Sequence, residues 1–298
     1  MSSDEWRTDA ELREVARSAG VSAWVHAQRL GGPPDAVGLN AFESVAIASL
    51  YKLPLALTWA DLAEEEELDP CGRMRLPAAG RVGGPTGIAL LLDDVEMSQR
   101  DVVRQMLAVS DNAAGDAIFA TIGRARIDDH LTALGFPSGM VRQGSADETR
   151  AMMRDTGSET WLEAQRLLAD PDRVTTTSQY DPAYASSATA ADLTRLLGML
   201  WLRAGYGHAI IREAMAQQAW RHRIGSGFPH DDVTVFGKTG TLGALRHETA
   251  VVQFPHEHPI AIAVLTRSVR PERHQPRVDA AIGELARLAV RPLRMPAA

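Results

Sequence analysis

The chain has 298 residues, 45% of them apolar, so it can bury a large core as one domain or as two lobes. Its formal net charge of −7 argues against nucleic-acid binding, which selects basic surfaces. Cys71 is the single cysteine, which excludes an intramolecular disulfide bond.

The first sixty residues alternate between helical and extended patterns. Residues 1–20 place apolar side chains on one face among charges, which predicts a helix. Ser22–Arg29 and Ala36–Phe42 flank a Gly-Gly-Pro-Pro turn and predict a β-hairpin. The apolar run Val45–Ala63 is too long for a strand, so it predicts a buried helix with Ser49 in its first turn.

The middle of the chain is mostly helical in pattern. Ser98–Ser110 predicts an amphipathic helix with Ser98 as its N-cap, and Ala113–Ile122 predicts another helix. Two further helices are expected at Thr189–Ala204 and Ala209–Gln218.

The last third changes to the two-residue period of strands. Val233–Phe236 and Leu242–Arg246 lie on either side of residues 238–240, and Thr249–Phe254 and Ile260–Thr266 are alternating or apolar runs. These segments predict three strands before a terminal helix at Asp279–Val290. This order predicts an α/β (α+β) fold of two lobes that form one catalytic unit. Residues 1–45 and 190–298 would form an antiparallel sheet flanked by helices, and residues 46–189 an all-helical lobe.

The 31 basic residues include only two lysines, Lys52 and Lys238. Arginine replaces lysine wherever a plain positive charge suffices, so these two positions are expected to need an amine that can lose its proton. Both lie in short motifs, and a third motif lies between them: Ser49-Leu50-Tyr51-Lys52, Ser110-Asp111-Asn112 and Lys238-Thr239-Gly240.

These motifs, in this order, resemble those of the serine β-lactamase and penicillin-recognising superfamily, in particular its class A branch. Chance would place all three in order in fewer than about one chain in a thousand of this length. The resemblance extends over residues 49–57, 98–114 and 218–267, and it implies the two-lobe fold predicted above.

The chemistry of the first motif follows from its spacing. A serine hydroxyl is a weak nucleophile and needs a base within hydrogen-bond reach. On a helix, Lys52 lies one turn after Ser49 on the same face. Burial and the nearby charge of Lys238 would favour its neutral amine, which can accept the proton.

The resemblance implies roles for the other two motifs. Ser110 would relay a proton to the leaving nitrogen, and Asn112 would bind the amide side chain of the substrate. Lys238 and Thr239 would bind its carboxylate.

Three more positions are implied to act close to the strand of the third motif. The backbone N–H groups of Ser49 and Thr241 would form the oxyanion hole. Gly240 would let the substrate approach the strand closely. Arg246 would add a second charge for the carboxylate, although it does not stand at the family's usual arginine position.

The sequence departs from class A enzymes in one respect. Those enzymes activate the deacylating water with a glutamate in an E-x-x-L-N pattern, and no such pattern occurs between residues 128 and 185. Glu148 lies at nearly the right distance without the leucine and asparagine. We interpret it as a solvated loop residue, and the alternative is that it is the catalytic base of deacylation. Hydrolysis of the acyl-enzyme is then expected to be slow.

Three functions therefore stay open. The first is a β-lactamase-like hydrolase acting through acyl-Ser49 on a small amide, lactam or ester that bears a carboxylate. The second is an intracellular esterase, peptidase or acyltransferase, and the third is a β-lactam-binding protein that is acylated without efficient turnover.

No cofactor, metal, nucleic acid or membrane partner is expected, and we expect a monomer. Residues 1–20 lack the pattern of a secretory signal and no apolar run reaches the ~18 residues that span a bilayer, which predicts a cytoplasmic location. His256 and His258 lie between prolines in an expected turn rather than a metal site, and His222 is expected to be structural.

Overall fold

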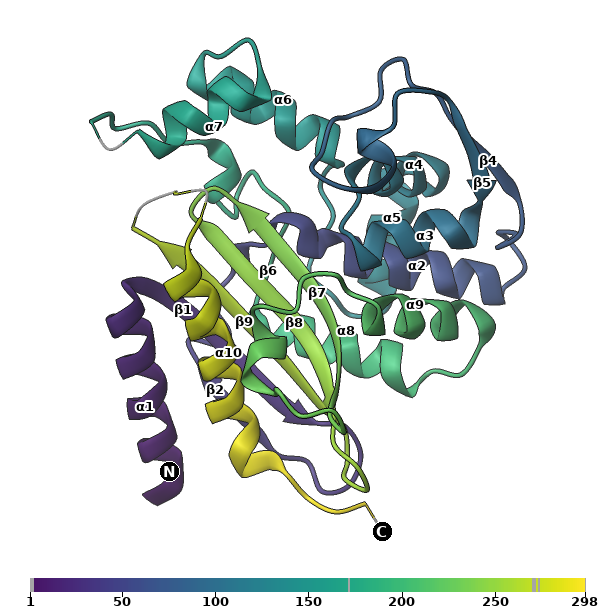
Figure 1. Ribbon diagram of the computed structural model, residues 1–298. Helices are drawn as coiled ribbons and strands as arrows, with labels where there is room; N and C mark the ends of the chain where they lie inside the picture. Colours follow the sequence, from purple (N-terminus) through teal and green to yellow (C-terminus); the bar gives the residue numbers. More distant parts are fainter. Residues whose placement is uncertain (1–2, 171, 270–271, 273, 298) are drawn as a thin grey trace.

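The computed structural model describes residues 3–170, 172–269, 272 and 274–297 (Figure 1). Its centre is a five-stranded antiparallel sheet in the order β2-β1-β9-β8-β7. The strands are β1 (Val21–Arg29), β2 (Ala36–Leu39), β7 (Thr234–Leu242), β8 (Leu245–Gln253) and β9 (Ile260–Ser268). The predicted fold class, an α/β fold with an antiparallel sheet flanked by helices, is confirmed.

Helices cover both faces of this sheet. Helices α1 (Ser3–Ala19) and α10 (Pro276–Val290) pack on one face, and α8 (Ala190–Leu202) packs on the other (Figure 1). In β9, Ile260, Ile262 and Val264 pack in the cluster that includes α10, whereas the alternate residues 261, 263 and 265 join the cluster formed with α8. Successive side chains point to opposite faces, so an uninterrupted apolar run fits a strand buried on both sides.

Four helices pack around α2 (Lys52–Glu64), whose residues 52–62 are all buried. They are α3 (Gln99–Ala108), α4 (Asn112–Ile122), α5 (Arg124–Ala133) and α9 (Tyr206–Ala216). Helix α6 (Ser145–Thr156) packs on α4, and α7 (Trp161–Ala169) packs on α6. Two short two-stranded sheets complete the fold, β3 (Val45–Ala46) with β6 (Ser187–Ala188) and β4 (Arg73–Leu76) with β5 (Val95–Ser98). The prediction that residues 46–189 are all-helical is therefore wrong. No helix of the described ranges is long and apolar enough to cross a membrane.

The prediction of a single helix from Val45 to Ala63 is wrong at the start of that segment. Residues 48–51 form a 3₁₀ turn, and the α-helix begins only at Lys52. Ala48 has a φ of 47°, a left-handed conformation that interrupts any helix from the preceding strand. Pro54 fits this start, because its missing N–H falls in the first turn of α2, where no intrahelical acceptor is available.

The prediction of an extended segment at Leu242–Arg246 is only partly right. Strand β7 runs without a break through the Lys238 motif to Leu242, and β8 begins at Leu245. Between them lies a two-residue hairpin turn at residues 243–244, in which Gly243 has a φ of 51°. The Lys238 motif therefore lies on a strand at the edge of the sheet.

Candidate active site

Ser49 is distinguished by its exposure. From Ala46 to Leu62, every residue is buried except Ser49, which is partly exposed. It lies in the wall of a cavity of about 880 Å³. The other lining residues include members of all three motifs: Ser110, Asn112, Glu148, Thr149, Trp161, Leu162, Trp220, His222, Arg223, Thr239, Thr241, Arg246 and Asp279.

Lys52 is fully buried, and its amine makes two hydrogen bonds. Nζ donates to the carbonyl oxygen of Ser110 at 2.7 Å and to Oδ1 of Asn112 at 2.9 Å. Burial lowers the pKa of Lys52 to about 8, although the charges of Asp111, Glu148 and Asp116 oppose the shift. A neutral amine has two N–H groups and one lone pair. The two acceptors use both N–H groups, so the lone pair is left to take a proton.

Ser110 contacts both lysines through different oxygens. Its Oγ accepts from Lys238 Nζ at 2.8 Å, while its carbonyl accepts from Lys52. A φ of 61° at Ser110, between α3 and α4, turns the chain so that both contacts form. Lys238 also donates to the carbonyl of Thr239 at 2.7 Å. Burial, followed by the charges of Lys52 and Arg223, holds the pKa of Lys238 well below its ordinary value.

Asp111 fixes the start of α4. Its Oδ1 accepts from the N–H groups of Ala113 at 2.9 Å and Ala114 at 3.3 Å, which is an N-cap arrangement. The aspartate of the second motif is therefore explained by helix capping, and it places Asn112 in the first turn. Nδ2 of Asn112 donates to the carbonyl of Gly83 at 3.3 Å, at the cavity wall.

Gly240 lets two segments of the chain approach each other. A Cβ at this position would lie 2.8 Å from the carbonyl oxygen of Ile47 and 3.1 Å from Leu50 Cγ. Glycine is thus required by the turn that carries Ser49, a reason independent of substrate approach. Because β7 is an edge strand, Thr241, which follows Gly240 on this strand, is exposed to the cavity.

Arg223 is a cavity residue that the sequence analysis did not identify. It is 3% exposed and donates to the carbonyls of Gly240 at 3.0 Å and His247 at 2.7 Å and to Oγ1 of Thr241 at 2.7 Å. These hydrogen bonds hold the end of β7 in place. No local spacing signals this role, because its partners lie 17 to 24 residues away. His222, expected to be structural, lines the cavity with a side chain that is 49% exposed.

Arg246 reaches the cavity, but it is paired within the protein. Its Nη1 lies 3.0 Å from both carboxylate oxygens of Asp279, in the first turn of α10. Arg223 Nε donates to the same carboxylate at 2.8 Å. One carboxylate thus faces two guanidinium groups, so it compensates only part of their combined positive charge.

The interpretation of Glu148 as a solvated loop residue is wrong. It lies in the first turn of α6, is only partly exposed and lines the same cavity as Ser49. Burial raises the pKa of Glu148 to about 7, with Lys52 opposing the shift and Asp116 adding to it. Asp116 also holds the start of α6, since its carboxylate accepts from the N–H of Ala146 at 2.9 Å. Adjacent acidic residues at positions 147 and 148 are a signal of a helix N-terminus.

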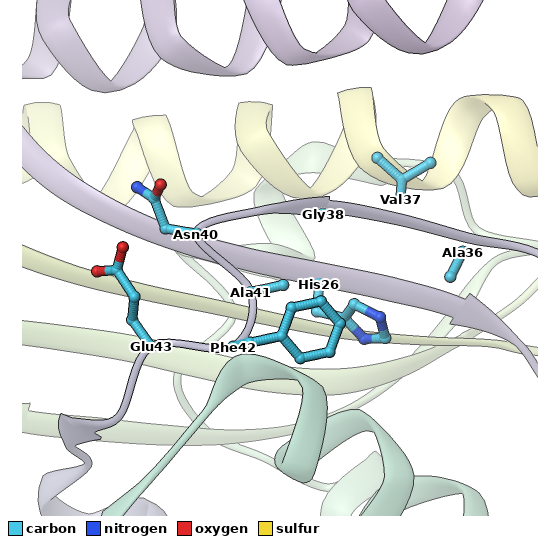
Figure 2. Close-up of a pocket in the computed structure, with 8 residues that line it drawn as sticks. All are labelled: His26, Ala36, Val37, Gly38, Asn40, Ala41, Phe42 and Glu43. Carbon is cyan, nitrogen blue, oxygen red and sulfur yellow. The ribbon is translucent and has the colours of Figure 1, made fainter. Parts of the chain in front are cut away.

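Figure 2 shows a different, more open hollow beside β1 and β2. The rings of Phe42 and His26 lie there with centroids 6.2 Å apart. Its polar groups are used internally: His26 Nδ1 is bonded to Thr194 Oγ1 at 2.6 Å, and Glu43 accepts from Trp24 Nε1 at 2.8 Å. Within the ranges that the structure describes, no three His, Cys, Asp or Glu side chains gather to hold a metal ion.

Comparison with known proteins agrees with this geometry. A family model described as the beta-lactamase enzyme family matches residues 7–293. The chain belongs to this family. A beta-lactamase regulatory protein from Streptomyces cacaoi, BlaB, is 30% identical over 296 residues, covering 93% of this chain and 94% of that protein. The resemblance inferred from the three motifs is confirmed.

Solved structures of family members share the fold. A β-lactamase from Burkholderia phymatum superimposes with a TM-score of 0.78 at 17% identity, covering 98% of this chain and 100% of that one. A class A β-lactamase from Mycobacterium abscessus gives a TM-score of 0.74 at 18% identity, covering 96% and 98%.

Proposed function

We propose that this protein is a β-lactamase-like serine hydrolase that opens small carboxylate-bearing amides, β-lactams foremost, through an acyl-Ser49 intermediate. One observation carries the proposal. Ser49 is the accessible hydroxyl in a segment that is otherwise buried from residue 46 to residue 62, at the wall of a cavity that Ser110 and Asn112 also line. Membership of the family supports the same reaction class.

In acylation, the Lys52 lone pair takes the Ser49 proton as Oγ attacks the carbonyl carbon. The carbon–nitrogen bond then breaks, and the leaving nitrogen needs a proton. Ser110 would donate its hydroxyl hydrogen to that nitrogen, and Lys238, which donates to Ser110 Oγ, would replace it by passing a proton to the same oxygen. The N–H groups of Ser49 and Thr241 would stabilise the oxyanion.

The substrate carboxylate would bind at the end of the cavity formed by β7. Thr239 and Thr241 line the cavity there, and the oxygen of Thr241 accepts from Arg223, so its hydroxyl hydrogen can be donated to the substrate. The buried side chains of Lys238 and Arg223 lie behind them. Arg246, which shares the Asp279 carboxylate with Arg223, would add part of its charge.

Deacylation needs a base that activates water, and Glu148 is the candidate that the cavity offers. Glu148→Gln should accumulate an acyl-enzyme that the wild type turns over, because acylation by Lys52 survives while water activation fails. Intact-mass spectrometry after penicillin addition measures the adduct. We expect turnover to fall at least about a hundredfold, the usual contribution of a general base.

The pH dependence provides a second check on Glu148. A general base acts when it is deprotonated, and burial raises the pKa of Glu148 to about 7. Deacylation should therefore speed up as the pH rises through about 7. Asp147→Asn, at the exposed neighbouring position, is the matched control and should behave as wild type. A Glu148→Gln variant that matches wild-type turnover would exclude this role.

A second candidate function is a β-lactam sensor that is acylated and stays acylated. The similarity to the regulatory protein BlaB favours it. A chromogenic cephalosporin separates the candidates: steady turnover supports the hydrolase, and one burst of product per protein molecule supports the sensor. No reaction, together with ester hydrolysis, would favour an esterase, peptidase or acyltransferase.

A further inference from the structure

A buried hydrogen-bond chain reaches Lys52 from outside the three motifs. The hydroxyl of Tyr51 lies 2.9 Å from Oγ of Ser145, and Ser145 Oγ lies 3.2 Å from Oδ1 of Asn112. The same Oδ1 accepts from Lys52 Nζ at 2.9 Å. Tyr51 and Ser145 are 2% and 1% exposed, so solvent does not compete for these groups.

The donor and acceptor of each of these hydrogen bonds follow from the orientation of the Asn112 amide. The Asn112 amide donates through Nδ2 to the Gly83 carbonyl, so its Oδ1 is the acceptor for both of its other partners. Ser145 must therefore donate to Oδ1, and its own oxygen is left to accept from Tyr51. Burial strongly raises the pKa of Tyr51, so its hydroxyl keeps its proton and remains a donor.

We propose that Ser145 is a positioning residue for the general base, because its hydroxyl occupies Asn112 Oδ1 and weakens that acceptor's hold on a protonated Lys52. The inference rests on the proposed function, in which Lys52 is the base. An ammonium gains more than an amine from a strong acceptor. Asn112 Oδ1 already accepts from Ser145, so the positive hydrogen of that hydroxyl lies next to it. This arrangement favours the neutral amine of Lys52.

The charged groups around Lys52 stay in place when only this hydroxyl is removed. They are Asp111 and Asp116 from α4, Glu148 from α6 and Lys238 from β7. Asp116 bonds to the backbone N–H groups of residues 145 and 146 rather than to the side chain of Ser145. Ser145→Ala keeps those bonds and hence the start of α6.

The two-lysine composition makes the test direct. Protein labelled with [ε-¹³C]lysine gives two side-chain signals, and Lys52→Arg identifies the one that belongs to Lys52. In Ser145→Ala, we expect the Lys52 titration midpoint to rise by about 0.5 to 1 pH unit. Tyr51→Phe should shift it less and in the same direction, because Ser145 still donates but is no longer polarised by a donor. Ser145→Thr, which keeps the hydroxyl, should restore the wild-type midpoint.

Ser98→Ala is the control for general destabilisation, because it removes a buried helix-capping hydroxyl that does not contact Lys52. Its Lys52 midpoint should stay at the wild-type value. An unchanged or lowered midpoint in Ser145→Ala would overturn the inference and leave Ser145 a purely structural residue. The titration uses no substrate. If penicillin fails to acylate the wild type, the proposed function is refuted, but the measured Lys52 midpoints still test the role of Ser145. If acylation occurs, its rise with pH should move upward by the same interval in Ser145→Ala.

Discussion

Ser49→Ala should abolish covalent labelling by penicillins and by fluorophosphonates while the protein stays folded. The hydroxyl is the atom that forms the acyl bond, and alanine replaces it at a partly exposed position without changing the packing of the buried residues around it. Intact-mass spectrometry measures the adduct, and circular dichroism and thermal unfolding report the fold.

Ser44→Ala is a suitable comparison for this experiment, because Ser44 lies five residues earlier and is exposed. It should be labelled at the wild-type rate. A stoichiometric adduct on Ser49→Ala would place the nucleophile elsewhere and remove the basis of the proposed function.

Lys52→Arg should reduce acylation by roughly 10² to 10⁴, the range that general acid–base catalysis supplies. Arginine keeps the positive charge but stays protonated, so it cannot take the Ser49 proton. Stopped-flow acylation with a chromogenic cephalosporin gives the rate.

The lysine side chain is tightly packed, since a Cβ at Gly115 would lie 2.9 Å from Lys52 Cε. A second variant therefore separates lost chemistry from poor packing. Lys52→Met keeps an unbranched apolar chain of similar length and should be as slow as the arginine variant, with a cooperative unfolding transition. Substantial activity in either variant would show that another group is the base.

The sequence predicted the parts of the fold that depend on local pattern. The apolar run from Ile260 predicted β9, and the three motifs predicted catalytic roles for Ser49, Lys52 and Lys238, which stay predictions. The break in the helix at Ala48 could not be predicted from the helical pattern. It occurs where Ile47 approaches Gly240 on β7, a contact between segments far apart in the sequence. The division into lobes at residues 45/46 and 189/190 stays a prediction.

The site residues that pattern reasoning missed depend on contacts between distant segments. Arg223 and Asp279 are 56 residues apart, and no local sequence pattern around either residue predicts that they form an ion pair. Glu148 was misjudged because its burial depends on α6 being held by Asp116, about 30 residues earlier. Such contacts form only in the folded protein, so the local sequence pattern does not predict them.

The placement of the two lysines also has a consequence for how the folded protein meets proteases. Both are 0% exposed, on α2 and on β7, whereas arginines are spread over the surface. A lysine-specific endoproteinase can therefore cut only when one of these two elements opens, and the unfolded chain would give the fragments 1–52, 53–238 and 239–298. The rate of that cleavage therefore reports how often α2 or β7 opens. A bound inhibitor that closes the cavity should slow it, even while arginine-specific cleavage of exposed loops proceeds unchanged.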